Sequence, residues 1–571
     1  MSPNDSLPID ASFANLEEYL DSLLDFVSSN TLFQRLCGGV HILDFLTRRR
    51  DLYESVLPVE WRDWFLNQDV PAIIHLLLRE SVPQLEQMRH AQTNQSSTGR
   101  QLEEILPPES LLDYVLNVRR LALNRVFLPA QDAQSPRDLP RPTTVGMKPK
   151  KIHEVQNFAA YIDALCCSLS NSQNCPIHLI DFGSGQNYLG RALASPPYSK
   201  SIIALESKRH NIYGAQAMDV HAKVADKQRT IRNKKTYVSS ITDAQPMGEN
   251  DIKDAAPHHQ SLVRYVETMI KDGDLSTVIG RRNIESVGGS TNPSYLVISL
   301  HSCGNLLHHG LRSIVLNQSV KAVAMVGCCY NLMTERLGPA TFKLPSLRSP
   351  NRRVDQASSA CDPHGFPMSH RMATYSHNGG RGIRLNITAR MMACQAPQNW
   401  TRQECESFFT RHFYRALLQR ILLNQGVVGR PVEDNNDIED ARDEESTSDA
   451  GPAITIGSLR KGCYASFVAY VRGAQIKMAA DPDHRTLLAK AMVNLSDEDI
   501  EQYEQLYASR EKDLSILWTL MAFSATVVEA VIVVDRWLYL REQPEVAECW
   551  VEPVFEYQQS PRNLVVVGIK R

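Results

Sequence analysis

Apolar residues recur at helical spacing through about the first 130 positions and in short continuous runs after that. Within residues 13–36 they fall three or four positions apart, which is the pattern of an amphipathic helix with one face in a core. Further helices are predicted around 40–50, from Pro58, over 73–85 and over 108–126, with a polar loop at 92–99. The pattern therefore predicts a helical N-terminal region over residues 1–130.

Beyond a proline-rich linker at 131–149, the pattern becomes that of an α/β domain. A helix is expected over 150–169, ahead of a series of short apolar runs bounded by polar residues. Such runs are typical of parallel strands that are covered on both faces. The expected strands end near Phe182, Glu206, Ser240, Leu300 and Val326, with a helix at 208–227 after the second of them. Two last strands, 549–557 and 564–570, favour an antiparallel hairpin that closes the sheet.

Three further segments are read as additions to a domain that spans 150–571. Residues 241–292 are polar and predict an insertion with one helix near 262–271. Residues 337–374 are a second insertion, interpreted as a lid or as disordered. Residues 430–452 form an acidic linker, because 433–445 hold eight carboxylates against one arginine. Helices are expected over 400–423, 460–471, 497–507 and 514–540.

The helix at 514–540 is apolar enough to imitate a membrane span. It contains Glu529, however, and the pair Asp535-Arg536 follows its most apolar part. Charged groups are costly inside a bilayer, so we expect a helix buried against the sheet and no stable membrane insertion.

The turn after the first strand carries the clearest chemistry. It reads Asp181-x-Gly183-x-Gly185, and glycines there let the backbone approach a ligand closely. A dinucleotide fingerprint needs a third glycine where Tyr188 stands, so NAD is disfavoured. An acidic residue two positions before the first glycine is instead the arrangement of S-adenosylmethionine (SAM) methyltransferases. Glu206, at the end of the second strand, could accept both ribose hydroxyls of such a nucleoside.

Other candidates follow from the rule that ligands sit beyond the carboxyl ends of parallel strands. His301 could take a proton from an acceptor, or could be a histidine bonded beneath the pocket. Lys151 could present a cation to the cofactor's carboxylate, or could be a solvated helix start. Ser184 and Asn187 in the turn, with Ser239 and Cys303 near two further strand ends, complete the candidate cofactor residues.

Composition sets only broad limits. The chain has 571 residues, a net charge of −3 and a pI near 6.6, so no overall basicity indicates nucleic acid. A basic cluster at 223–235 could meet phosphates or be a solvated helix end. Twelve cysteines without a CxxC pair, and no signal-peptide pattern after Met1, indicate reduced thiols in the cytoplasm or nucleus. No cysteine pair has the usual spacing of zinc ligands, so no metal is expected.

Several motifs together resemble the methyltransferase-like protein twenty-five family, whose relatives are labelled ribosomal RNA adenine dimethylase domain-containing. The similarity covers about residues 147–571. The motifs are Lys150-Lys-x-His153-Glu154-Val155, Asp181-x-Gly-Ser-Gly185, His301-x-Cys-Gly304, Val326-Gly-Cys-Cys-Tyr330 with Thr334-Glu335, Phe366-Pro-Met-Ser369 and Ser560-Pro-Arg-Asn563.

The resemblance implies a class I, Rossmann-like seven-stranded methyltransferase sheet that binds SAM through Asp181, Gly183 and Gly185, with Glu206 on the ribose. One departure is Asn187, where the family favours glycine. Asparagine tolerates the left-handed backbone, so an altered turn is expected rather than a lost site.

Adenine dimethylases carry an Asn/Asp-Pro-Pro-aromatic motif after the fourth strand, whereas this chain has His301-Ser-Cys-Gly there. That strand end is similar to tRNA ribose 2′-O-methyltransferases. The expected function is methyl transfer from SAM to a macromolecule, with RNA ahead of protein. The alternative is a catalytically weak methyltransferase fold that scaffolds partners through its N-terminal helices.

Overall fold

The computed structural model describes most of the chain in ten stretches. These are residues 6–49, 51–98, 106–128, 138–173, 175–225, 262–283, 293–337, 361–430, 453–480 and 492–571, the last without 493–494. The expected strand at 235–240, with Ser239, and nearly all of the basic cluster and the acidic linker therefore lie outside the described residues.

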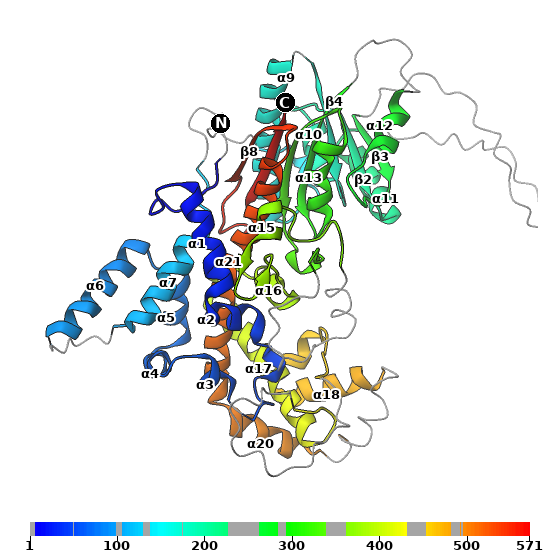
Figure 1. Ribbon diagram of the computed structural model, residues 1–571. Coiled ribbons are helices and arrows are strands. Elements are labelled where there is room, and N and C mark those ends of the chain that lie inside the picture. The colour runs from blue at the N-terminus through cyan, green and yellow to red at the C-terminus, as the bar shows by residue number, and fades with distance from the viewer. Residues whose placement is uncertain are drawn as a thin grey trace, which may run out of the picture.

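Seven strands form one sheet in the order β3-β2-β1-β4-β5-β9-β8 (Figure 1). The first five pair in parallel, while β9 runs antiparallel to both β5 and β8. The C-terminal hairpin predicted from the sequence is thus confirmed. The strands are β1 (Ile177–Phe182), β2 (Ile202–Glu206), β3 (Val263–Glu267), β4 (Ser294–Ser302), β5 (Val320–Gly327), β8 (Val546–Pro553) and β9 (Leu564–Lys570).

Helices cover both faces of the sheet, as the continuous apolar runs predicted. One face packs against α9 (Pro149–Gln173) and α10 (Tyr188–Ala194) in a separate apolar cluster. The other face packs against α13 (Leu306–Leu316) and the long α21 (Arg510–Arg541), and this second core continues into the N-terminal helices. The order of the parallel strands reverses direction between β1 and β4, so the carboxyl ends of these strands border a crevice typical of ligand sites.

The N-terminal region is helical, as expected, and packs around α21 (Figure 1). The helix predicted around 40–50 is wrong, because the described part of that segment holds only a 3-10 turn at Ile42–Asp44. The prediction of a polar loop at 92–99 is wrong, because α6 continues to Thr98. No glycine or proline interrupts the sequence between Pro83 and Gly99, so the helix propagates through polar side chains. The helices are α1 (Leu16–Ser29), α2 (Thr31–Gln34), α3 (Leu52–Val56), α4 (Val59–Leu66), α5 (Val70–Ile74), α6 (Val82–Thr98) and α7 (Glu109–Leu121).

The predicted helix near 262–271 is also wrong, since this segment is the edge strand β3. Ile202 pairs with Val263 and Ala204 with Tyr265, which satisfies backbone groups that β2 would otherwise expose. Within the second insertion, residues 361–374 are ordered and contain α15 (His370–Thr374), while 338–360 lie outside the described residues.

Four of the remaining helices were expected, and the three short ones at 141–144, 276–283 and 387–392 were not. The helix expected over 460–471 begins later, at α18, after one 3-10 turn. They are α8 (Arg141–Thr144), α11 (Arg209–His221), α12 (Ser276–Asn283), α16 (Ile387–Met392), α17 (Arg402–Asn424), α18 (Phe467–Ala479) and α20 (Asp497–Tyr507).

The apolar helix α21 is the one described helix long and apolar enough to cross a membrane, and 94% of its most apolar window is buried in the protein. Its charged residues have partners inside the fold. Glu529 pairs with Arg125 at 2.5 Å and with Arg562, and Asp535 accepts hydrogen bonds from the backbone of Met368 and Ser369. The expectation of a buried helix is therefore confirmed.

Candidate functional site

The turn between β1 and α10 has the backbone that its glycines permit. Gly183 and Gly185 have φ of 69° and 57°, in the left-handed region that residues with a side chain rarely adopt. A Cβ on Gly183 would lie 2.8 Å from Leu306 Cδ2, so the leucine side chain would have to move to admit any other residue. The amides of Gly183 and Ser184 both donate to the Leu205 carbonyl oxygen, at 2.9 and 3.0 Å, which fastens the turn to β2.

Glu206 ends β2 directly beside this turn. Its Oε2 accepts the Gly185 amide at 2.9 Å and its Oε1 accepts the Lys208 amide at 2.7 Å. Asp181 is also buried, at 3% exposure. Burial, with the nearby charge of Glu206, raises the pKa of Asp181 to about 8. The structure thus brings the two predicted acidic residues to the same turn, where a ligand with a cation would relieve the cost of ionising Asp181.

Asn187 has φ 53° and ψ 38°, the left-handed conformation expected for it. Its Nδ2 donates to the Tyr265 hydroxyl at 2.7 Å, and that hydroxyl donates to Asp219 at 2.5 Å. Arg191 pairs with Asp219 at 2.9 Å, completing a buried network. The asparagine side chain therefore bonds the turn to β3. Sequence reasoning missed Tyr265 because its segment was interpreted as a helix.

His301 is the second-last residue of β4 and has a φ of 72°, beside a shift in the β4–β5 register. Its Nε2 lies 2.8 Å from Oε2 of Glu154 on α9, and Lys151 Nζ lies 2.5 Å from the same oxygen. Burial alone would raise the pKa of Glu154, but His301 and Lys151 hold it at about 2.

Two of the predicted residues thus converge on an acid that sequence reasoning had given no role. Its signal was the Lys-Lys-x-His-Glu run at the start of α9. The contact also places Lys151 on Glu154, so the lysine is already partnered by a carboxylate of the protein.

The turn fits a nucleoside cofactor by two observations. The Ser184 hydroxyl is buried with no hydrogen-bond partner among the described residues. A Cβ built on Gly185 would meet only the Gly183 carbonyl oxygen, at 4.0 Å, so a ligand could approach the backbone there. With an unpaired hydroxyl, an open backbone and two acids, the turn has the groups that a ribose and an amino acid moiety need.

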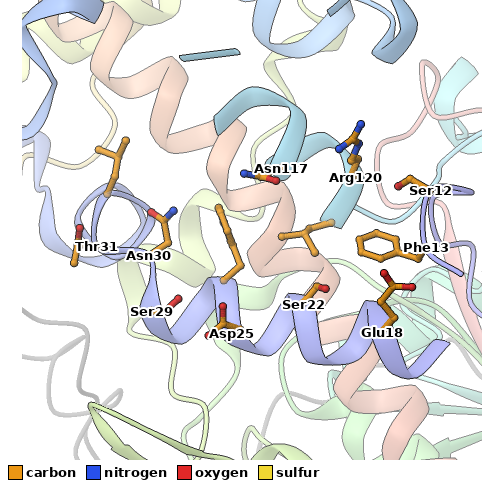
Figure 2. A pocket seen from close by; sticks show the side chains of 13 residues that line it. Ser12, Phe13, Glu18, Ser22, Asp25, Ser29, Asn30, Thr31, Asn117 and Arg120 are labelled. Carbon is orange, nitrogen blue, oxygen red and sulfur yellow. The ribbon is translucent and has the colours of Figure 1, made fainter. Parts of the chain in front are cut away.

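A pocket of about 830 Å³ lies elsewhere, in the helical region between α1 and α7 (Figure 2). Its lining includes Glu18, Asp25, Asn117 and Arg120, and none of the predicted site residues. A pocket by itself therefore does not identify the site, which is defined by the turn and the strand ends.

Cys303 follows β4, where its Sγ lies 3.3 Å from that of Cys328 and 3.6 Å from the His301 carbonyl oxygen. A hydrogen bond from Cys328 lowers the pKa of Cys303 to about 6. These contacts thus relate Cys303 to the cysteines after β5 rather than to the glycine turn.

Residues 150–336 match a family model described as a methyltransferase domain. The chain is also similar to two proteins named probable methyltransferase-like protein 25. It is 29% identical to that of Mus musculus over 279 residues and 25% identical to that of Homo sapiens over 276. Each match covers 48% of this chain and 37% of the relative. No solved structure matches.

These findings confirm the expected family resemblance, as a distant homology, and the class I methyltransferase-like fold. They indicate no substrate.

Proposed function

Because residues 150–336 carry a methyltransferase domain, we propose that the protein transfers a methyl group from SAM to a macromolecule, with RNA as the acceptor class. The observation that carries the proposal is the turn at the carboxyl end of β1. Two left-handed glycines, a buried aspartate and a glutamate bonded to the turn lie together there.

In this proposal Asp181, Gly183 and Gly185 bind the amino acid end of SAM, and Glu206 binds the ribose. Ser184 gains a partner for its buried hydroxyl. SAM supplies an electrophilic methyl group on a sulfonium, and its positive charge would favour the ionised form of Asp181. The protein's task is then largely to align the acceptor, because positioning alone lowers such barriers considerably.

The contact between His301 and Glu154 supports a hydroxyl acceptor. With Nε2–H directed at a carboxylate, Nδ1 is the nitrogen that can accept a proton, and the histidine side chain is 26% exposed. Exposed cations near the cofactor turn and the start of α9, including Lys150 and Arg209, would suit a phosphate backbone. Both features favour RNA ribose over a protein side chain.

The first test is calorimetric titration of the purified protein with SAM. Asp181→Ala should abolish binding, while Asp63→Ala, at an exposed aspartate in α4, should leave it unchanged. If the wild-type protein binds no SAM, the roles of the turn residues are refuted and the scaffold alternative is favoured.

The second test is transfer of labelled methyl from SAM into a lysate from cells that lack the protein. Label that is released by nuclease supports RNA, and label released by protease refutes it in favour of a protein acceptor. His301→Ala should lower the transfer rate about 10²- to 10⁴-fold if the histidine is the base, with SAM binding retained.

A further inference from the structure

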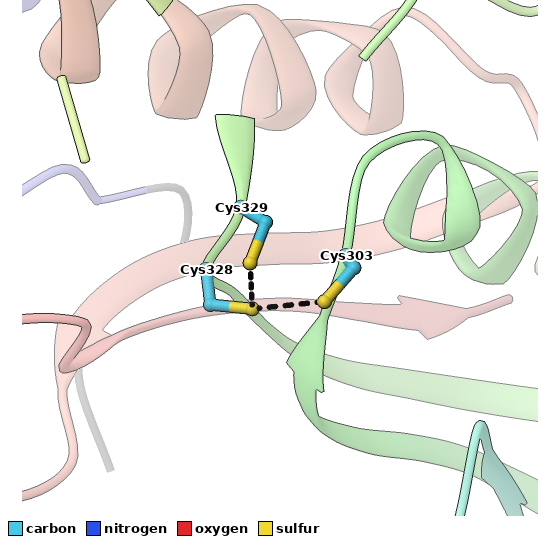
Figure 3. Close-up of side chains that lie close together, drawn as sticks. All are labelled: Cys303, Cys328 and Cys329. Atoms are coloured by element: carbon cyan, nitrogen blue, oxygen red, sulfur yellow. Dashed lines mark hydrogen bonds between the residues drawn. The ribbon is translucent and has the colours of Figure 1, made fainter. Parts of the chain in front are cut away.

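Three cysteines gather where β4 and β5 end (Figure 3). Cys303 follows β4, while Cys328 and Cys329 follow β5, the neighbouring strand. The Sγ atoms of Cys303 and Cys328 lie 3.3 Å apart, and those of Cys328 and Cys329 lie 3.4 Å apart. All three sulfurs lie within 4.8 Å of one another. The separation of 25 residues between Cys303 and Cys328 conceals this cluster in the sequence.

The backbone holds the cluster in place. The Cys328 amide donates to the Ser302 carbonyl oxygen at 3.3 Å, and the Gly304 amide donates to the Cys329 carbonyl oxygen at 3.2 Å. Gly304 has φ 55°, and a Cβ there would lie 2.5 Å from the Leu332 carbonyl oxygen. The two strand ends are therefore tied together by bonds that a larger residue at 304 would break. Thiols fixed in this way lose little entropy when they bind a common ligand.

We propose that Cys303, Cys328 and Cys329 bind a thiophilic metal ion, with Zn²⁺ as the first candidate. A tetrahedral zinc with Zn–S bonds near 2.3 Å requires sulfurs about 3.8 Å apart. The two Sγ–Sγ distances of 3.3 and 3.4 Å differ from this value by about half an ångström, which small side-chain rotations can supply. Three thiolates leave a fourth position open, as in zinc sites that bind a water or a substrate atom.

The surroundings suit a site that is reached from solvent. Cys303 is exposed, and Cys328 and Cys329 are half-buried. Cys394, two residues after the end of α16, donates through its Sγ to the Cys328 carbonyl oxygen at 3.7 Å, so a fourth thiol is close by. The ion would lie at the same edge of the sheet as His301. The open position of the ion could hold an oxygen or nitrogen of the acceptor, which would extend the proposed function. The metal site itself does not depend on that function.

The test uses the full chain, reduced and stripped of metal with a chelator. Zn²⁺ is titrated in competition with a chromophoric chelator, and Co²⁺ is added separately to record thiolate-to-cobalt charge-transfer absorption. One equivalent of each ion should bind. Cys303→Ser and Cys328→Ser should each lower the Zn²⁺ affinity at least tenfold and remove most of the charge-transfer absorption. Cys167→Ser, at an exposed cysteine on α9, should match the wild type.

Thermal melting of the metal-free variants shows whether they fold, and Cys329→Ser provides a further variant if one does not. The proposal is overturned if the wild type binds no Zn²⁺ tightly, or if the cysteine variants bind it as the wild type does. Asp181→Ala, which removes the proposed SAM contact, should still bind the metal. Metal binding without SAM binding would thus refute the proposed function alone, and the reverse result would refute the metal site alone.

Discussion

Replacing Asp181 by asparagine should stabilise the free protein while impairing the cofactor site. Asp181 is 3% exposed and lies near the charge of Glu206, and burial with this charge raises its pKa from 3.8 to about 8. In the unfolded chain the same carboxyl ionises near its ordinary pKa. At a pH between these two pKa values, ionisation of the carboxyl therefore stabilises the unfolded state and not the folded state.

The sign follows from the direction of the shift. A raised pKa in the folded state means that the contribution of Asp181 to stability is greatest below about pH 4 and is lost as the pH rises towards 8. At about 1.4 kcal/mol for each pH unit, the loss by pH 7 is at most about 4.5 kcal/mol. Asparagine cannot ionise, so Asp181→Asn should gain stability relative to the wild type over this range.

The assay is thermal melting of both proteins from pH 4 to pH 8.5, with Asp63→Asn as the control at an exposed aspartate. The melting temperature of Asp181→Asn should exceed that of the wild type by several degrees at pH 8, with the difference shrinking towards pH 4. A variant that melts below the wild type at pH 8, or a difference independent of pH, would refute the reasoning. SAM affinity of the wild type should rise with pH up to about 8, because the cationic ligand needs the ionised carboxylate.

Three other substitutions have definite expected outcomes. Gly183→Ala should abolish SAM binding and cost about 1–3 kcal/mol in a denaturation experiment, because of its positive φ and its contact with Leu306. Glu154→Gln should destabilise the protein by about 3 kcal/mol at pH 7, because the lowered pKa of Glu154, about 2, stabilises the fold above pH 4.5. The difference in stability between variant and wild type should vanish as the pH falls towards 2, and a difference that does not change with pH would contradict this. Glu154→Gln should also lower the transfer rate if His301 is the base. Glu529→Gln should cost about 3–5 kcal/mol by leaving the buried Arg562 and the half-buried Arg125 without their anion, and a near-neutral result in urea denaturation would count against this.

Local sequence patterns predicted a strand or helix correctly where the segment's side chains suit only one kind of surroundings. The apolar runs that became β1, β2, β4 and β5 bury nearly all their side chains, so they could lie only inside a sheet. The helix expected over 497–507 forms over these residues, and the Ser496 side chain caps its first turn. The prediction for residues 262–271 failed because a partly exposed edge strand has no distinctive sequence pattern. This segment becomes a strand by pairing with β2.

The sequence by itself determined the glycine turn, the two acidic residues beside it and the apolar runs that became β1, β2, β4 and β5. These depend on backbone conformation and on hydrophobic periodicity, both of which are local. Only the tertiary structure decided that Glu154 contacts His301, that Asn187 bonds through Tyr265 to Asp219, and that the cysteines after β4 and β5 form one cluster. Each of these contacts joins residues from different elements, and its geometry is fixed by how strands pair and helices pack. No spacing along the chain encodes that geometry.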